Sequence, residues 1–443
     1  FGLPRSRQAH PSRIPPAPPH QPGNMASSQP GVVVVGGGLS LLNYLEAAKT
    51  TRSITVVMGC GFLEWPMAST YFLAKPEAHD EFLCCDPEKY QKKGITYLVE
   101  VAQRVKPQEK VLVCASGKEI PYEVLIVATG FKLPLLMPTP GQTLQQRKEE
   151  IKAAGATIRA ARTVVLSGAG SIGLEMAGDI RVQYPDKKVV LLSRTGQVLS
   201  GSHPEKLQKQ ALEQLKRMRI EVVKGSVDAT EPILAMGRLS VQGGDVANID
   251  FDVFLPTFMQ GPNTSFLEGP GVLNQRGQLQ VNDFLQSKAH KDIFTIGCGD
   301  VDQGYVAAGK LQKQAQDVAA NVTALLAGKP LKAHKDPMPF MTRPPLVKIG
   351  HGPGGYMWFD QEVLPGPARC CSCCGMGGFP FCPPPCCWCC CKGSCMQCCG
   401  TCGGECGGEA TARFYFHGLM KMFPSKNGYL GMGEGAPAQQ TMA

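Results

Sequence analysis

Residues 164–173 read VVLSGAGSIG, and residues 32–40 read VVVVGGGLS. Each stretch starts with a short apolar run that predicts a buried parallel strand, and each leads into a helical pattern. Glycines at such a turn let the backbone approach a pyrophosphate, while the N-terminal N–H groups and dipole of the helix attract its charge. The two loops therefore predict two dinucleotide sites in one chain, with one nucleotide donating electrons to the other.

The rest of the chain alternates strand and helix patterns around these loops. Strands are predicted at 32–35, 54–58, 111–114, 124–127, 164–167, 188–192 and 219–223, and helices at 41–49, 143–155, 172–182, 204–217 and 306–326. Such alternation is typical of an α/β fold with parallel sheets. Residues 293–300 have the character of a closing strand, so the second nucleotide unit is predicted to be inserted into the first.

Length and charge narrow the class of protein. A chain of 443 residues has room for two or three domains, and its net charge of +9 is mild. No basic run interleaved with aromatic residues indicates a nucleic-acid partner, although the surplus charge would suit an anionic membrane surface. No apolar stretch approaches the ~18 residues that a membrane-spanning helix needs.

The two ends of the chain have unusual compositions. Residues 1–30 hold eight prolines, three arginines and no acid, which predicts a disordered tail. The tail is either the remnant of an organelle transit peptide or sequence upstream of a start at Met25, and we favour the second. Fifteen of the 20 cysteines lie between Cys370 and Cys406. The other five cysteines are spread over the rest of the chain, which is too few for a disulfide-bonded scaffold. The body of the chain is therefore predicted to be an enzyme of a reducing intracellular compartment, cytoplasmic or organellar.

Five motifs follow one another along the chain in the order that one family of enzymes shows: Gly36–Gly38, Phe62–Pro66, Val127–Gly130, Gly168–Gly178 and Ile293–Asp300. In this order they resemble the two-dinucleotide flavoprotein reductases, in particular the apoptosis-inducing-factor-like, ferroptosis-suppressor-type NAD(P)H:quinone oxidoreductases. The resemblance covers about residues 31–360. It implies that hydride passes from NADH or NADPH to FAD, which then reduces a quinone-like acceptor.

The resemblance also implies a domain plan and a set of contacts. FAD is expected on 31–158 and 259–330, NAD(P)H on 159–258, and a small C-terminal α+β domain on 331–443. The implied FAD contacts are Gly36, Gly37, Gly38, Ser40, Glu64, Ala128, Thr129, Gly130, Gly297 and Asp300; the implied NAD(P)H contacts are Gly168, Ala169, Gly170, Ser171, Ile172, Gly173 and Arg194. Glu175 is expected to face the nicotinamide as the catalytic residue.

The second glycine loop keeps all three of its glycines, but the strand after it ends without an acid. An acid there would bind the ribose hydroxyls of NADH, whereas this chain has Leu192-Ser193-Arg194. A guanidinium in that place favours the 2′-phosphate of NADPH. The alternative is that Arg194 is a solvated turn residue.

The first loop departs from the pattern at three FAD contacts. Leu41 replaces the third glycine and should crowd the helix against the strand, and Met58 replaces the acid expected for the ribose. Cys298 follows Gly297 where an aspartate is expected, with Asp300 two residues late as a substitute if the loop shifts. Either FAD binds in an altered way, which we favour, or the chain is a catalytically silent nucleotide-binding subunit or sensor in a larger assembly.

Other residues have plainer interpretations. Glu64 could be an ordinary surface acid, Cys84-Cys85 is interpreted as structural, and Lys310 is expected on a solvated helix face. No Cys-x4-Cys pair follows the first loop, which argues against a disulfide reductase, and the scattered histidines predict no metal site.

The cysteine-rich insert at 366–409 leaves three interpretations open. It could be a Zn²⁺ or Cu⁺ thiolate cluster, a palmitoylated segment that contacts a membrane, or a species-specific insertion. A metal-thiolate storage protein is accordingly a third, weaker function. Residues 414–423 either lie on a membrane or, as we favour, complete the C-terminal domain. The oligomeric state is not predicted.

Overall fold

The structure is a computed structural model that describes residues 30–64, 66–84, 94–201, 203, 205–267, 269, 271–301, 308–336, 347 and 349–350. The predicted tail, the cysteine-rich insert and residues 414–423 lie outside these ranges, apart from Pro30. None of the helices in the described ranges is long and apolar enough to cross a membrane. The same ranges contain no cluster of three His, Cys, Asp or Glu residues that could hold a metal ion.

The first sheet is built around β1 (Gly31–Val35). Its parallel neighbours are β2 (Ile54–Met58) on one side and β8 (Glu119–Val127) on the other, with β5 (Ile95–Val99) beyond β2 and β15 (Ile293–Thr295) beside β8. The first half of β8 also pairs antiparallel with β7 (Val111–Cys114), which pairs with β6 (Ala102–Lys106). All four valines of β1 are buried, as expected for a parallel strand covered on both faces.

The second sheet is wholly parallel and has the order β11-β10-β9-β14. Its strands are β9 (Thr163–Ser167), β10 (Lys188–Ser193), β11 (Ile220–Lys224) and β14 (Val253–Pro256). The helices α4 (Ser171–Gln183) and α5 (Glu205–Arg217) connect them, and β12 (Gly237–Ser240) and β13 (Asn248–Phe251) form a hairpin. All of these elements lie between β8 and β15 in sequence, so the predicted insertion of one unit into the other is confirmed.

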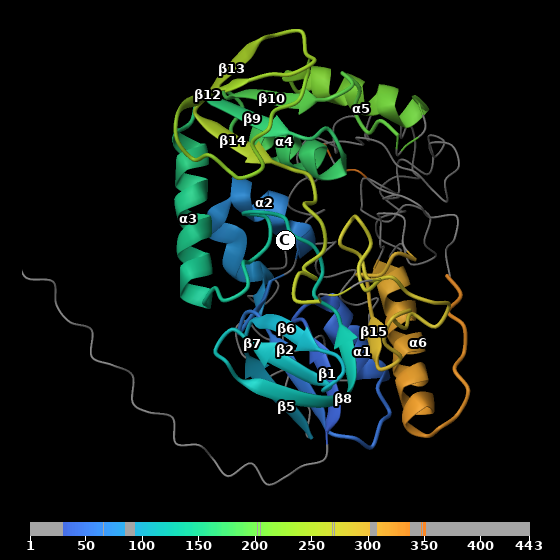
Figure 1. The fold of residues 1–443 in the computed structure, drawn as a ribbon. Helices are drawn as coiled ribbons and strands as arrows, with labels where there is room; N and C mark the ends of the chain where they lie inside the picture. Colours follow the sequence, from blue (N-terminus) through green and yellow to red (C-terminus); the bar gives the residue numbers. More distant parts are fainter. Residues whose placement is uncertain are drawn as a thin grey trace, which may run out of the picture. The chain divides into compact units, whose positions relative to one another are not determined.

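Two long helices flank the sheets. On the first sheet, α1 (Leu39–Ala47) packs against α6 (Ala308–Leu326), and Figure 1 shows α6 running beside β15. Ahead of the second sheet, α3 (Leu144–Ala160) begins at Thr143, which with Gln146 forms a capping box. The predicted helices and strands around both glycine loops are confirmed within a few residues of their bounds.

A small helical region was not anticipated from the sequence. The strands β3 (Leu63–Glu64) and β4 (Leu83–Cys84) pair across the short helices η1 (Pro66–Ala68), α2 (Ser69–Ala74) and η2 (Pro76–Phe82). The helix α2 packs on both α3 and α4. The helix η2 also packs on α3, and Gly155 of α3 permits this, because a Cβ there would collide with the ring of Pro76.

The expectation that Lys310 lies on a solvated face is wrong. Lys310 is 6% exposed, and its Nζ lies 2.7 Å from Asp336 Oδ2. Residues 332–336 run back along α6 and cover its polar side, through contacts of Lys332 with Asn321, His334 with Asp317, and Asp336 with Lys310. A helix that looks solvated in sequence is thus buried by a segment that follows it.

Candidate dinucleotide-binding sites

The second glycine loop has the geometry of a phosphate cradle. Gly168 has φ +118°, a backbone conformation that favours glycine. A Cβ on Gly173 would collide with the carbonyl oxygen of Gly168, so only glycine at position 173 lets α4 start this close to the end of β9. Gly170 caps α4 without a side-chain hydrogen bond, and a Cβ there would meet no atom within 4 Å. The start of α4 therefore faces open space, as a bound pyrophosphate requires.

Thr257 holds this loop in place, a role that the sequence did not reveal. It follows β14, and its Oγ1 donates to the carbonyl oxygens of Ser167 (3.0 Å) and Gly168 (2.9 Å). The remaining predicted contacts, Ala169, Ser171 and Ile172, are half-buried around the loop. Glu175 is also half-buried, about one turn into α4.

The first glycine loop makes a comparable cradle with the end of β8. Gly36 has φ +137°, and a Cβ on it would collide with the carbonyl oxygen of Ala128. Gly38 caps α1 without a side-chain bond and faces open space. Asn263 fixes the neighbouring turn, since its Nδ2 donates to Thr129 O (3.2 Å) and its backbone N–H to Gly130 O (2.8 Å).

The start of α6 approaches the same cradle. Gly297 has φ +81°, and a Cβ on it would lie 2.7 Å from Leu311 Cδ2 and 3.6 Å from Ser40 Oγ. Its backbone N–H donates to Gln314 Oε1 at 2.8 Å. The structure therefore brings Ser40 and Gly297 together, as the predicted FAD site requires.

Asp300 is held elsewhere. Its Oδ1 accepts from the backbone N–H of Val281 (3.0 Å), and Lys288 Nζ lies 4.0 Å from Oδ2. The residue nearer the cradle is Cys298, whose Sγ lies 3.7 Å from Thr129 Oγ1 and is fully buried. Burial raises the pKa of the Cys298 thiol, so a neutral group occupies the place of the expected carboxylate.

The two other departures of the first loop meet in space. Leu41 and Met58 are 2% and 5% exposed and belong to one apolar cluster with Val34. Met58 Cε also lies 3.2 Å from the position of a Cβ on Gly37. The helix α1 accommodates Leu41 because Met58 provides an apolar neighbour where the pattern expects an acid.

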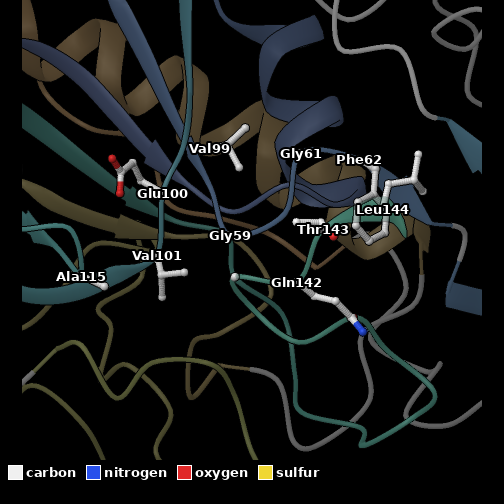
Figure 2. Close-up of a pocket in the computed structure, with 11 residues that line it drawn as sticks. Gly59, Gly61, Phe62, Val99, Glu100, Val101, Ala115, Gln142, Thr143 and Leu144 are labelled. Atoms are coloured by element: carbon white, nitrogen blue, oxygen red, sulfur yellow. The ribbon is translucent and has the colours of Figure 1, made fainter. Parts of the chain in front are cut away.

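A cavity of about 340 Å³ opens where β2 and β5 end. Figure 2 shows Val99 and Glu100 on one side of Gly59, and Thr143 and Leu144 on the other. Glu100 is the only ionisable residue of the lining, and its backbone N–H donates to Met58 O at 2.9 Å. Nucleotides bind at such carboxyl edges of parallel strands, and the first glycine loop follows β1 at the same edge of the sheet.

Glu64 is not the surface acid that one interpretation expected, because it is 6% exposed. Its Oε1 accepts from Arg147 Nη2 (2.7 Å), and its Oε2 accepts from Arg147 Nε (2.8 Å) and contacts His79 Nε2 (2.7 Å). Burial opposes ionisation of Glu64, but the hydrogen bonds from Arg147 and His79 outweigh it and lower its pKa. The carboxylate thus joins β3, η2 and α3.

Comparison with known proteins agrees with this geometry. Residues 30–317 match the family described as pyridine nucleotide-disulphide oxidoreductase. The chain belongs to this family. Members of this family use FAD and NAD(P)H, and two dinucleotide cofactors suit a chain that carries two glycine cradles.

Individual relatives support the same family. An FAD-dependent oxidoreductase of Flammulina velutipes is 32% identical over 50% of this chain and 68% of its own length. Ferroptosis suppressor protein 1 of Xenopus laevis is 25% identical over 51% of this chain and 63% of its own length. The sulfide:quinone oxidoreductase of Aquifex aeolicus has the same fold, with a TM-score of 0.54 at 17% identity over 68% of this chain and 78% of that one.

Proposed function

We propose that this protein is an FAD-dependent NAD(P)H oxidoreductase that reduces a quinone-like acceptor. The observation that carries the proposal is the pair of glycine cradles, in each of which a helix starts at a glycine N-cap that faces open space. The FAD-binding part would comprise 31–158 and 259–330, and the NAD(P)H-binding part 159–258. FAD, when bound, accepts hydride from the nicotinamide and passes the electrons to the acceptor.

The residues of the first cradle would hold FAD. Gly36–Gly38 and the start of α1 would bind its pyrophosphate, and the 340 Å³ cavity beside Gly59 would take its adenosine end. Ser40, Gly297 and the turn Ala128–Gly130 would line its other end. Glu64 would act on this site indirectly. Its contacts with Arg147 and with His79 of η2 would fix the loop at residues 59–62, which precedes β3.

The second cradle would orient the nicotinamide nucleotide. Gly168–Gly173 and the start of α4 would bind its pyrophosphate, with Thr257 holding the loop. Glu175 would then lie near the nicotinamide ring, where its carboxylate would help to align the hydride donor.

An apolar acceptor is supported by the surface next to the first cradle. Phe258 and Met259 are 36% and 45% exposed on the loop after β14. The same loop is tied to the segment that follows β8, since Gln260 N–H donates to Lys132 O and Lys132 N–H donates to Gly261 O. Relatives named for ferroptosis suppression and for sulfide:quinone oxidation are consistent with a quinone. Because quinones dissolve in bilayers, peripheral membrane contact would suit this activity.

The visible absorption spectrum of the purified protein, before and after anaerobic NADPH, tests the proposal. We expect flavin bands near ~450 nm that bleach on reduction and return when a quinone is added. Met259→Gln should raise KM for an apolar quinone but not for ferricyanide. A colourless protein that takes up no FAD on reconstitution would instead favour the silent nucleotide-binding subunit.

A further inference from the structure

Two buried polar side chains meet where the short helix α2 packs on α4. Thr70 of α2 is 7% exposed, and Asp179 of α4 is 5% exposed. The hydroxyl Oγ1 of Thr70 donates to Asp179 Oδ2 at 2.9 Å, although 109 residues separate the two in sequence. This hydrogen bond therefore joins the part of the chain that carries the first glycine cradle to the helix that starts at the second.

The core around these two helices is apolar and reaches both cradles. Phe72 and Leu73 of α2 and Ala177 of α4 are fully buried in one hydrophobic cluster. Leu39, at the start of α1, and Ile172, at the start of α4, pack against the same cluster. Both glycine loops thus rest on one core, and α2 and α4 provide part of it.

Stability alone does not account for a polar pair in such a core. Burying a hydroxyl and a carboxylate costs desolvation energy, and an apolar pair of similar volume would stabilise the interface at least as well. Apolar contacts are non-directional, however, and they let two packed helices shift against each other. A hydrogen bond between two defined atoms adds direction, so it fixes one position of α4 relative to α2.

The position of α4 matters because this helix also carries Glu175. Glu175 lies four residues before Asp179, so the two carboxylates belong to the same side of α4, one turn apart. A shift of α4 against α2 would therefore move Glu175 and the start of α4 together relative to the first cradle.

We propose that Thr70 and Asp179 are positioning residues for hydride transfer between the two nucleotides. Their hydrogen bond holds α4, and with it Glu175, in the position relative to the first cradle from which the nicotinamide can reach the flavin. The inference rests on the proposed function. A misplacement of about 1 Å can slow a reaction by about 100-fold, so one contact between the two parts can set the rate.

Substitution of Thr70 tests this proposal, because valine keeps the shape of threonine but has no hydroxyl. Anaerobic stopped-flow mixing of the FAD-saturated protein with increasing NADPH gives both the rate of flavin bleaching at saturation and the Kd for NADPH. We expect Thr70→Val to lower that rate by about 10-fold or more and to leave the Kd unchanged. Thr70→Ser, which keeps the hydroxyl, should retain the rate of the parent protein.

Tyr184→Phe is the matched control, because Tyr184 forms another hydrogen bond between the same two helices. Its hydroxyl donates to the carbonyl oxygen of Ala74 at 3.0 Å, where α2 and α4 end. Thr70→Val and Tyr184→Phe should both lower the midpoint of guanidinium denaturation, but only Thr70→Val should slow flavin bleaching. In the nucleotide-free protein, Thr70→Val should speed amide hydrogen exchange over residues 174–179, and Tyr184→Phe only at the end of α4.

A bleaching rate of Thr70→Val within about 2-fold of the parent rate would overturn the proposal, even if stability fell, because the pair would then only support the fold. A loss confined to NADPH affinity would overturn it as well. These outcomes differ from failure of the proposed function, in which the parent protein itself holds no FAD or is not bleached by NADPH. In that case hydrogen exchange, which needs no nucleotide, still decides whether Thr70 holds α4, and unchanged exchange over residues 174–179 would refute it.

Discussion

Restoring glycine at the third position of the first loop, by Leu41→Gly, is expected to destabilise the protein. Leu41 is 2% exposed in a cluster with Val34 and Met58. Truncation of a buried leucine to alanine costs about 2.7–5 kcal/mol, and glycine within a helix costs about 1 kcal/mol more than alanine. The free energy of unfolding should therefore fall by about 4–6 kcal/mol, a large share of the ~5–15 kcal/mol typical of proteins.

The same substitution should not tighten FAD binding, because Met58 still occupies the position of the expected acid. Guanidinium denaturation would measure the stability, and quenching of flavin fluorescence on titration would measure the affinity. Leu42→Gly is the matched control, since it makes the same chemical change on the same helix at a half-buried position and should cost less. Combining Leu41→Gly with Met58→Ala should give a loss that is not additive, because the two side chains belong to one cluster.

A loss below about 2 kcal/mol together with tighter FAD binding would refute this reasoning. It would mean that α1 moves back onto the glycine loop once Leu41 is removed. Leu41 would then obstruct the first cradle rather than support its core.

Three further predictions concern the glycines and the buried ion pair. Gly173→Ala should abolish binding of NADPH, measured by calorimetry, because its methyl group would collide with Gly168 O; Gly170→Ala should leave the fold intact, since that position is open. Arg147→Met should lower the free energy of unfolding by about 3–5 kcal/mol, because it removes both guanidinium hydrogen bonds from the buried carboxylate of Glu64 and leaves it only His79. Breaking the exposed Arg238–Asp250 pair should cost under about 1 kcal/mol. The pKa of Glu64 is lower in the folded protein than in the unfolded chain, so the unfolded chain binds the proton of Glu64 more readily. The stability that ionised Glu64 contributes is therefore present above the unfolded pKa near 4.5 and disappears as pH falls through the folded pKa. An acid titration of the free energy of unfolding should show this loss in the parent protein but not in Glu64→Gln.

Local patterns were sufficient for much of the fold. The valine runs before each loop predicted β1 and β9, because strands buried on both faces are continuously apolar. The spacing of Gly168, Gly170 and Gly173 predicted the second cradle, since only glycine fits where a helix starts so close to its strand. The strands β5, β6 and β14 were missed for two reasons: β6 (AQRVK) is largely polar, whereas β5 (ITYLV) and β14 (VFLP) are short apolar runs with no glycine loop after them to mark them.

Several functional groups gave no local signal. Arg147 lies in a polar helix, and nothing near it in sequence shows that it meets Glu64, 83 residues away. Thr257 and Asn263 fix the two cradles from a loop whose sequence resembles an ordinary turn. A polar residue just after a buried strand is the one signal that could have drawn attention to Thr257.

The sequence by itself determined that two nucleotide cradles exist and in which order the chain builds them, because glycine spacing and apolar periodicity act over a few residues. Only the tertiary structure decided how the departures from the pattern are accommodated. Leu41 meets Met58, and Cys298 replaces an acid beside Thr129. Each of these pairs comes from segments distant in sequence, and packing of the sheets and helices is what brings them together.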